Sequence, residues 1–179
     1  MKTLLVLFLF LGGALYAQDN KSFTYFDEKS GKDCLIGECD RTAFYDTLFT
    51  SWFDEEYENY VIDTEEAANF KREILSVDIV IVMGTWCSDS RREVPRFFKI
   101  LDYVSYPSEN VKIIAVNREK KGIDTETDNL NIKFVPTFII YKQGNEIGRI
   151  IETPSVSLEK DLTADRKSTR LNSSHESPS

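Results

Sequence analysis

The segment that most constrains this chain is a lone cysteine at a predicted strand-to-helix junction. Apolar β-forming residues run from Ile79 to Met83, and a helical pattern follows Cys87. We therefore expect Cys87 to lie where a strand ends and a helix begins. The free N–H groups of a helix N-terminus stabilise a thiolate, and Arg91 and Arg92 add positive charge, while Asp89 opposes them. The pattern predicts a nucleophilic thiol at Cys87.

Two motifs resemble the thioredoxin superfamily. The stretch Trp86-Cys87-Ser88-Asp89-Ser90 is similar to the W-C-x-x-C active-site motif, with Ser90 in place of the second cysteine. Further along, Phe134 to Tyr141 resembles the cis-proline segment and the strand that follows it. The similarity extends from about Thr64 to Leu162. The longer motif W-C-S-D-S-R-R-E-V-P-R-F, from Trp86 to Phe97, also resembles a branch of secreted bacterial thioredoxin-like proteins with a single active-site cysteine.

This resemblance implies roles for three further residues. Trp86 corresponds to the indole that shields the thiol and offers an apolar surface to a client, with simple packing as the alternative. Pro136 corresponds to the cis-proline opposite the cysteine, where the backbone of Val135 would pair with a bound peptide. The alternative is that Pro136 merely begins a strand.

The order of patterns along the chain predicts an α/β fold. We expect a helix capped by Asp63 or Thr64, a strand to Met83, the helix after Cys87, a strand from Lys112 to Asn117, a short helix, a hairpin of Thr137 to Tyr141 with Glu146 to Ile151, and a helix from about Ser155. This order is that of a thioredoxin-like fold, a central mixed β-sheet flanked by helices. It would occupy residues 64–163, after an N-terminal extension of residues 18–63.

The extension contains a run of aromatic residues at helical spacing. The spacing predicts an amphipathic helix from Thr42 to Phe53 that lays its apolar face on the domain. We interpret these aromatic side chains as part of the core. The alternative is an exposed aromatic rim that contacts client peptides.

Three cysteines cannot all pair within one chain. We expect a structural disulfide between Cys34 and Cys39, which would close a short loop, and a free Cys87. In the alternative, Cys39 pairs with Cys87 as a distant resolving thiol. Ser90 cannot resolve a mixed disulfide, although its hydroxyl is expected to donate a hydrogen bond to the Cys87 thiolate. Ile81 occupies the position of the buried acid of thioredoxins, so no buried base is expected there.

Both ends of the chain are expected to lie outside the fold. Residues 1–17 combine Lys2, an apolar stretch from Leu4 to Leu11 and small residues before Ala17. They predict a cleaved signal peptide and a periplasmic or secreted protein, because the stretch is shorter than the roughly 20 residues of a stable membrane anchor. Residues 164–179 resemble translated sequencing adapter and predict a disordered tail, which leaves the only histidine, His175, without a role and the last helix truncated.

Composition and residue spacing reduce the number of candidate functions. The net charge of −8 and the pI of about 4.8 argue against nucleic acid as a partner. The cysteine and histidine spacings predict neither a metal site nor a cofactor. The expected function is thiol-disulfide exchange through one nucleophilic cysteine, of the monothiol reductase or isomerase type, with protein thiol or disulfide clients and an external thiol donor. The alternative is a non-catalytic binding module for peptide or protein clients.

Overall fold

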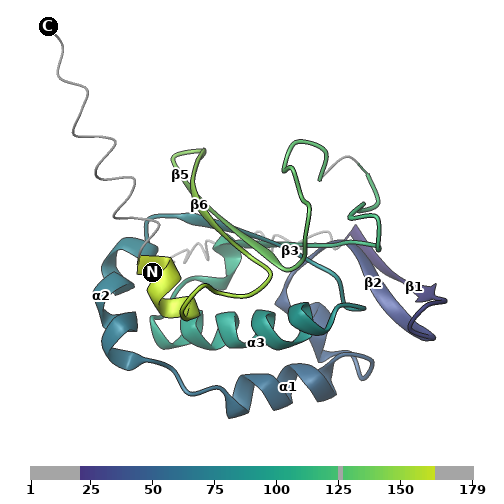
Figure 1. The fold of residues 1–179 in the computed structure, drawn as a ribbon, viewed down its shortest axis with the longest axis horizontal. Coiled ribbons are helices and arrows are strands. Elements are labelled where there is room, and N and C mark those ends of the chain that lie inside the picture. Colours follow the sequence, from purple (N-terminus) through teal and green to yellow (C-terminus); the bar gives the residue numbers. More distant parts are fainter. Residues whose placement is uncertain (1–20, 125–126, 164–179) are drawn as a thin grey trace, which may run out of the picture.

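A computed structural model describes residues 21–124 and 127–163 of the chain. The predictions for residues 1–17 and 164–179 lie outside these ranges. A six-stranded sheet with strand order β1-β2-β4-β3-β5-β6 forms the centre, and helices α1 and α3 lie under one of its faces (Figure 1). The elements are β1 (Lys21–Asp27), β2 (Lys32–Cys39), η1 (Arg41–Tyr45), α1 (Thr50–Asn59), α2 (Thr64–Ile74), β3 (Asp78–Met83), α3 (Ser88–Tyr103), η2 (Ser108–Asn110), β4 (Val111–Ala115), β5 (Thr137–Lys142) and β6 (Asn145–Ile151). The expected α/β fold with a mixed sheet flanked by helices is confirmed.

The central strands are buried on both faces. Strand β3 runs parallel to β4, with Ile81 opposite Ile113, and antiparallel to β5, with Ile81 opposite Phe138. Strands covered on both sides read as continuous apolar runs, which is the pattern that predicted β3. Strand β4 ends at Ala115, two residues earlier than predicted, because the side chain of Asn117 accepts the N–H groups of the residues that follow and turns the chain.

The predicted hairpin of β5 and β6 is also present. Its turn places Gln143 at φ 53° and Gly144 at φ 78°. Positive φ at both central residues is the geometry of the turns that match the twist of a two-residue hairpin. Local turn chemistry therefore accounts for this part of the sheet.

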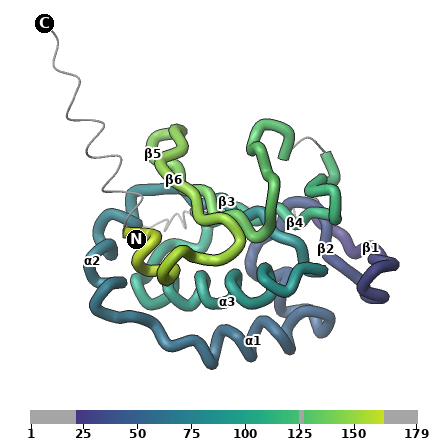
Figure 2. The backbone as a smooth tube through the Cα atoms, in the orientation of Figure 1, coloured from purple at the N-terminus to yellow at the C-terminus, as the bar shows by residue number. Residues whose placement is uncertain are grey.

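The N-terminal segment contributes two strands to which the sequence analysis assigned no structure. Strands β1 and β2 form an antiparallel hairpin, and β2 pairs antiparallel with β4, with Cys39 opposite Ile113. An ion pair of 2.6 Å between Lys112 and Glu38 also joins the hairpin to β4. The hairpin therefore extends the central sheet, and the tube in Figure 2 shows it at the edge farthest from β6.

The predicted helix from Thr42 to Phe53 is interrupted. A short 3₁₀ helix, η1, ends at Tyr45, and α1 begins only at Thr50. The break falls at Asp46, whose side chain accepts the N–H of Leu48. A short acidic side chain that bonds the local backbone in this way competes with a continuous helix.

The aromatic side chains of this region belong to the core, as interpreted from their spacing. Phe44, Phe49 and Phe53 are buried, and Trp52 packs against them. The rings of Phe44 and Phe53 stack at a centroid distance of 5.0 Å. Helix α1 lies beside α3 (Figure 1), and the ring of Phe53 contacts the ring of Phe98 in α3 at a centroid distance of 6.0 Å.

The remaining helices agree with the sequence in part. The side chain of Asp63 caps α2 by accepting the N–H of Glu66 at 3.0 Å, as predicted. The last helix covers 158–163 within the described residues, rather than starting near Ser155. The described parts of the connection between β4 and β5, residues 116–124 and 127–136, contain turns and no helix, so the short helix expected there is not present. None of the described helices has the length and apolar character required to cross a bilayer.

Candidate functional site

Cys87 is the N-cap residue of α3, immediately after the loop that leaves β3. Its N–H donates to the carbonyl of Gly84 at 2.9 Å, and its own carbonyl accepts the N–H of Arg91 at 3.1 Å. Its Sγ donates a hydrogen bond of 3.3 Å to the carbonyl of Val135, and the side chain is half-buried. The Val135–Pro136 peptide bond is cis, as the resemblance implies. The fold thus places the thiol at a helix N-terminus and against the proline loop.

Ser90 occupies the first turn of α3 and is fully buried. Its hydroxyl accepts the N–H of Gly84 at 3.2 Å. Among the described residues, the hydrogen bond of the Cys87 Sγ goes to Val135 rather than to the Ser90 hydroxyl that was predicted to donate to it. Ser90 therefore anchors the loop that carries the cysteine.

The indole of Trp86 lies over the end of β4. Its Nε1 donates to the carbonyl of Val116 at 2.8 Å, and the guanidinium of Arg118 lies 4.7 Å from its ring centroid. Trp86 also packs, together with Cys87, against the apolar cluster on the face of the sheet opposite α1 and α3. The structure brings Trp86, Val135 and Pro136 together around the thiol of Cys87.

The two arginines predicted to support the thiolate have other partners. Arg91 donates from Nε to the carbonyl of Thr85 at 2.5 Å. Arg92 forms ion pairs with Asp89 at 2.8 Å and with Glu93 at 2.7 Å. The hydrogen bond from Arg92 to Glu93 helps to raise the pKa of Arg92. Both guanidinium groups are therefore engaged with residues other than Cys87.

Ile81 occupies the position at which thioredoxins have a buried acid. Its side chain is fully buried in the sheet, so this position is apolar in the structure. The buried carboxylates of the described chain lie elsewhere and have partners: Asp27 binds Arg118, Glu93 binds Arg92, and Glu159 accepts from Tyr60. Within residues 21–124 and 127–163, no group of three or more His, Cys, Asp or Glu side chains is arranged to hold a metal ion.

The predicted disulfide between Cys34 and Cys39 is wrong. Both residues are free and lie on the single strand β2. A strand advances about 3.3 Å per residue, so their Cα atoms are about 16 Å apart, against the roughly 7 Å limit of a disulfide. An odd separation along a strand also directs the two side chains to opposite faces.

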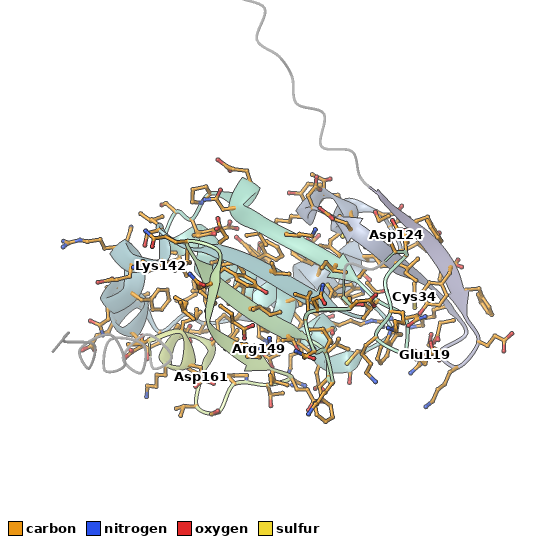
Figure 3. All side chains as sticks on the ribbon, turned by 90° about the horizontal axis from the view of Figure 1, so that it is seen from above. Cys34, Glu119, Asp124, Lys142, Arg149 and Asp161 are labelled. Atoms are coloured by element: carbon orange, nitrogen blue, oxygen red, sulfur yellow. The ribbon has the colours of Figure 1, made fainter. Side chains whose placement is uncertain are left out.

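The alternative in which Cys39 resolves Cys87 is also wrong for this fold. Cys39 belongs to the core cluster under α3, whereas Cys87 packs against the cluster on the opposite face of the sheet. Cys34 (labelled in Figure 3) is opposite Tyr25 of β1 and is fully buried. Cys39 therefore does not reach the Cys87 site in this structure.

Burial predicts different reactivities for the three thiols. Burial, followed by the nearby charges of Asp40 and Glu38, raises the pKa of Cys39 to about 12. We expect iodoacetamide at pH 8 to label Cys87 in the native protein and to label Cys34 and Cys39 only after unfolding. Peptide mass mapping at timed intervals measures this. Labelling of either β2 cysteine at a rate comparable with that of Cys87 would contradict the arrangement.

Sequence reasoning missed three residues that shape the site. Thr85 accepts the N–H of Leu35 at 2.9 Å through Oγ1, and Arg118 stacks on Trp86 while it pairs with Asp27. Thr85 directly precedes the Trp86-Cys87 motif, and this position in the sequence could have indicated that it belongs to the site. No local pattern links Asp27 to Arg118, because 91 residues separate them.

Comparisons with known proteins agree with this geometry. The Thioredoxin family model matches residues 61–164, more than half of the chain. A thioredoxin-like protein of Acanthamoeba polyphaga mimivirus is 29% identical over 84 residues, which cover 47% of this chain and 58% of that protein. The chain therefore spans little more than half the length of this curated relative.

Two solved structures show how far the likeness extends. A protein of unknown function from Pseudomonas aeruginosa has a TM-score of 0.50 and 17% identity, with coverage of 74% of this chain and 82% of that one. Mitochondrial thioredoxin 3 from Saccharomyces cerevisiae has a TM-score of 0.37 and 21% identity, with coverage of 54% and 88%. At 17% identity, the likeness to the Pseudomonas aeruginosa protein indicates the fold alone.

Proposed function

Because the chain belongs to the thioredoxin family, we propose that it carries out thiol-disulfide exchange through Cys87 alone. The observation that carries the proposal is the placement of this thiol. Of the three cysteines, Cys87 is the one that is not buried, and it lies at the N-terminus of α3 against the cis-proline loop. A thiol with these surroundings is partly accessible to a client disulfide.

The proposed reaction has two steps. The Cys87 thiolate attacks one sulfur of a client disulfide, a Cys87–client disulfide forms, and the other client sulfur leaves as a thiolate that takes a proton from water. An external thiol, or a second thiol of the client, then attacks the mixed disulfide and restores the Cys87 thiolate. Ser90 has no sulfur to perform this second step, so the chemistry is of the monothiol reductase or isomerase type.

The surface beside the thiol supports a peptide client. Phe134, directly before the cis-proline loop, is 50% exposed. Trp86 is half-buried and directly precedes Cys87 in the sequence. We infer that a client segment pairs with the backbone of Val135 and contacts these two rings. An exposed aromatic ring at a reactive thiol is suited to an apolar side chain next to the client disulfide.

The test uses a synthetic peptide in mixed disulfide with glutathione and reduced glutathione as the thiol donor. We expect the wild-type chain to accelerate release of the peptide thiol at least about tenfold over the uncatalysed exchange, and Cys87→Ala to return the rate to background. Cys39→Ala is the control, because it removes a buried thiol on the opposite face of the sheet from Cys87. A loss in Cys39→Ala equal to that in Cys87→Ala would contradict the single-cysteine mechanism.

A second candidate is a non-catalytic binding module. The observation that favours it is the loss of both catalytic partners of a dithiol thioredoxin, with Ile81 at the acid position and Ser90 at the second thiol position. In this case the same peptide in its reduced form binds with equal affinity to the wild-type chain and to Cys87→Ala, and neither protein accelerates exchange. Isothermal titration of both proteins distinguishes the two functions.

We also propose that the chain is exported to an oxidising compartment, either the periplasm or the exterior of a bacterial cell. The pattern of residues 1–17, with Lys2 before a short apolar stretch, supports this proposal. Expression of the full chain in a bacterium, followed by intact-mass analysis of the periplasmic fraction, is the test. A product that begins at Gln18 is expected, and retention of residues 1–17 would contradict cleavage.

A further inference from the structure

An ion pair connects the N-terminal hairpin with the connection that follows β4. Arg118 donates from Nε to Asp27 Oδ1 at 2.9 Å and from Nη2 to Asp27 Oδ2 at 2.7 Å. Asp27 is the last residue of β1 and its side chain is 7% exposed. A bidentate arginine-carboxylate pair fixes direction as well as distance. The hairpin therefore holds the guanidinium in one orientation.

The same guanidinium contacts the indole beside the reactive thiol. Arg118 lies 4.7 Å from the ring centroid of Trp86, within the range of a cation-π interaction. Trp86 also lies close against Gly84, where an added Cβ would be 2.5 Å from Trp86 Cε2. Together with the bond from Trp86 Nε1 to the carbonyl of Val116, these contacts fix the ring at three places.

The second strand of the hairpin reaches the same loop. The N–H of Leu35 in β2 donates to Thr85 Oγ1 at 2.9 Å, and both residues are buried. Thr85 directly precedes Trp86. The hairpin thus contacts the cysteine loop by way of its backbone and contacts the indole by way of Arg118, although residues 21–60 lie outside the region that the family model matches.

We propose that Asp27 is a positioning residue, which acts through Arg118 to hold the Trp86 indole as a preformed platform for clients beside Cys87. The inference rests on the proposed exchange function and adds the part of the chain that shapes its client surface. The pair is ionised at neutral pH, because hydrogen bonds from Arg118 hold the pKa of Asp27 well below its usual range. A ring fixed before binding loses less freedom when a client docks.

The first experiment separates client binding from thiol chemistry. Asp27→Asn and Arg118→Met are expected to lower the second-order exchange rate with the peptide mixed disulfide about two- to tenfold, the range expected when one large side chain loses its preorganisation. Alkylation of Cys87 by iodoacetamide should stay within about twofold of wild type, because the helix N-terminus is unchanged. The double variant should be no slower than the slower single variant, since both act on one contact.

The second experiment observes the indole directly. The chain has two tryptophans, so Trp52→Phe leaves Trp86 as the single emitter. In this background, Asp27→Asn and Arg118→Met should move the Trp86 emission to longer wavelength as the ring gains contact with water. Glu38→Gln is the matched control, because it breaks another ion pair between the hairpin and β4, that with Lys112. The control should alter neither emission nor exchange rate.

The outcomes distinguish this inference from the function on which it rests. If wild type exchanges and both variants keep its peptide rate and its emission, the positioning role is overturned and the exchange function stands. If wild type does not exchange, the exchange function fails, and the emission shift alone decides whether Asp27 positions Trp86. Equal losses in Glu38→Gln would assign the effect to docking of the hairpin and overturn the inference. Should Asp27→Asn fail to fold, Arg118→Met carries the same tests.

Discussion

Ser90→Cys is expected to convert the single-thiol site into a dithiol site. Residue 90 lies in the first turn of α3, on the same helix end as Cys87, and its side chain is buried against the cysteine loop. A thiol there can attack a Cys87–client disulfide within the molecule. Breakdown of the mixed disulfide should become independent of the external thiol and at least about a hundredfold faster at millimolar thiol, because held reactants have high effective concentrations.

The measurement follows the mixed disulfide by rapid acid quench and mass spectrometry at several concentrations of reduced glutathione. The Ser90→Cys product should carry a disulfide between Cys87 and the introduced thiol and no bound peptide, whereas wild type should accumulate the peptide adduct. Ser88→Cys is the control, because Ser88 is adjacent to Cys87 in the chain, where a disulfide is strained. Breakdown in Ser90→Cys that still scales with the glutathione concentration would contradict the expected geometry.

Phe44→Ala is expected to cause the largest loss of stability among single changes in the N-terminal segment. Phe44 is fully buried and its ring stacks on Phe53 and meets the edge of Trp52 at 5.8 Å. Truncation of a buried phenylalanine costs about 3–5 kcal/mol of unfolding free energy, through lost burial and the cavity that remains. Urea unfolding followed by circular dichroism measures the loss.

The neighbouring residue provides the control for this prediction. Tyr45 is 64% exposed in the same 3₁₀ helix, so Tyr45→Ala should change the unfolding free energy by less than about 0.5 kcal/mol. A similar small effect in both variants would show that η1 is not part of the core. The expected contrast would instead mean that the segment before residue 61 is needed for the stability of the matched region.

The two predictions concern different parts of one structural unit. The proposed exchange site is built from the end of β3, the start of α3 and the loop before β5. The N-terminal segment covers α3 with aromatic rings and adds β1 and β2 to the sheet edge. The Trp86 loop lies where these parts meet, through Thr85 and Arg118. Within the N-terminal segment, truncation of Phe44 is therefore expected to affect stability, and substitution of Asp27 is expected to affect client exchange.

Local patterns in the sequence determined the elements around the thiol. The apolar run before Cys87 predicted β3, the polar turn Lys142 to Asn145 predicted the last hairpin, and the cap at Asp63 or Thr64 predicted the start of α2. Each of these depends on residues within a few positions of one another, through strand periodicity, turn dihedral angles or a side-chain cap. The resemblance of the Cys87 and Pro136 motifs then indicated that the two segments meet.

Only the tertiary structure decided the cysteine pairing and the surroundings of Trp86. Cys34 and Cys39 point to opposite sides because both lie on strand β2, and the sequence did not reveal that strand, which forms by pairing with β1 and with the distant β4. The contact of Asp27 with Arg118 likewise requires β1 to lie at the edge of the sheet next to a distant loop. The sequence by itself determined which residue is the candidate nucleophile and which elements hold it, because these follow from local backbone preferences. Strand order and packing decided that the distant residues Asp27 and Arg118 lie beside Trp86, the neighbour of this cysteine, because strand order and packing are set by the chain as a whole.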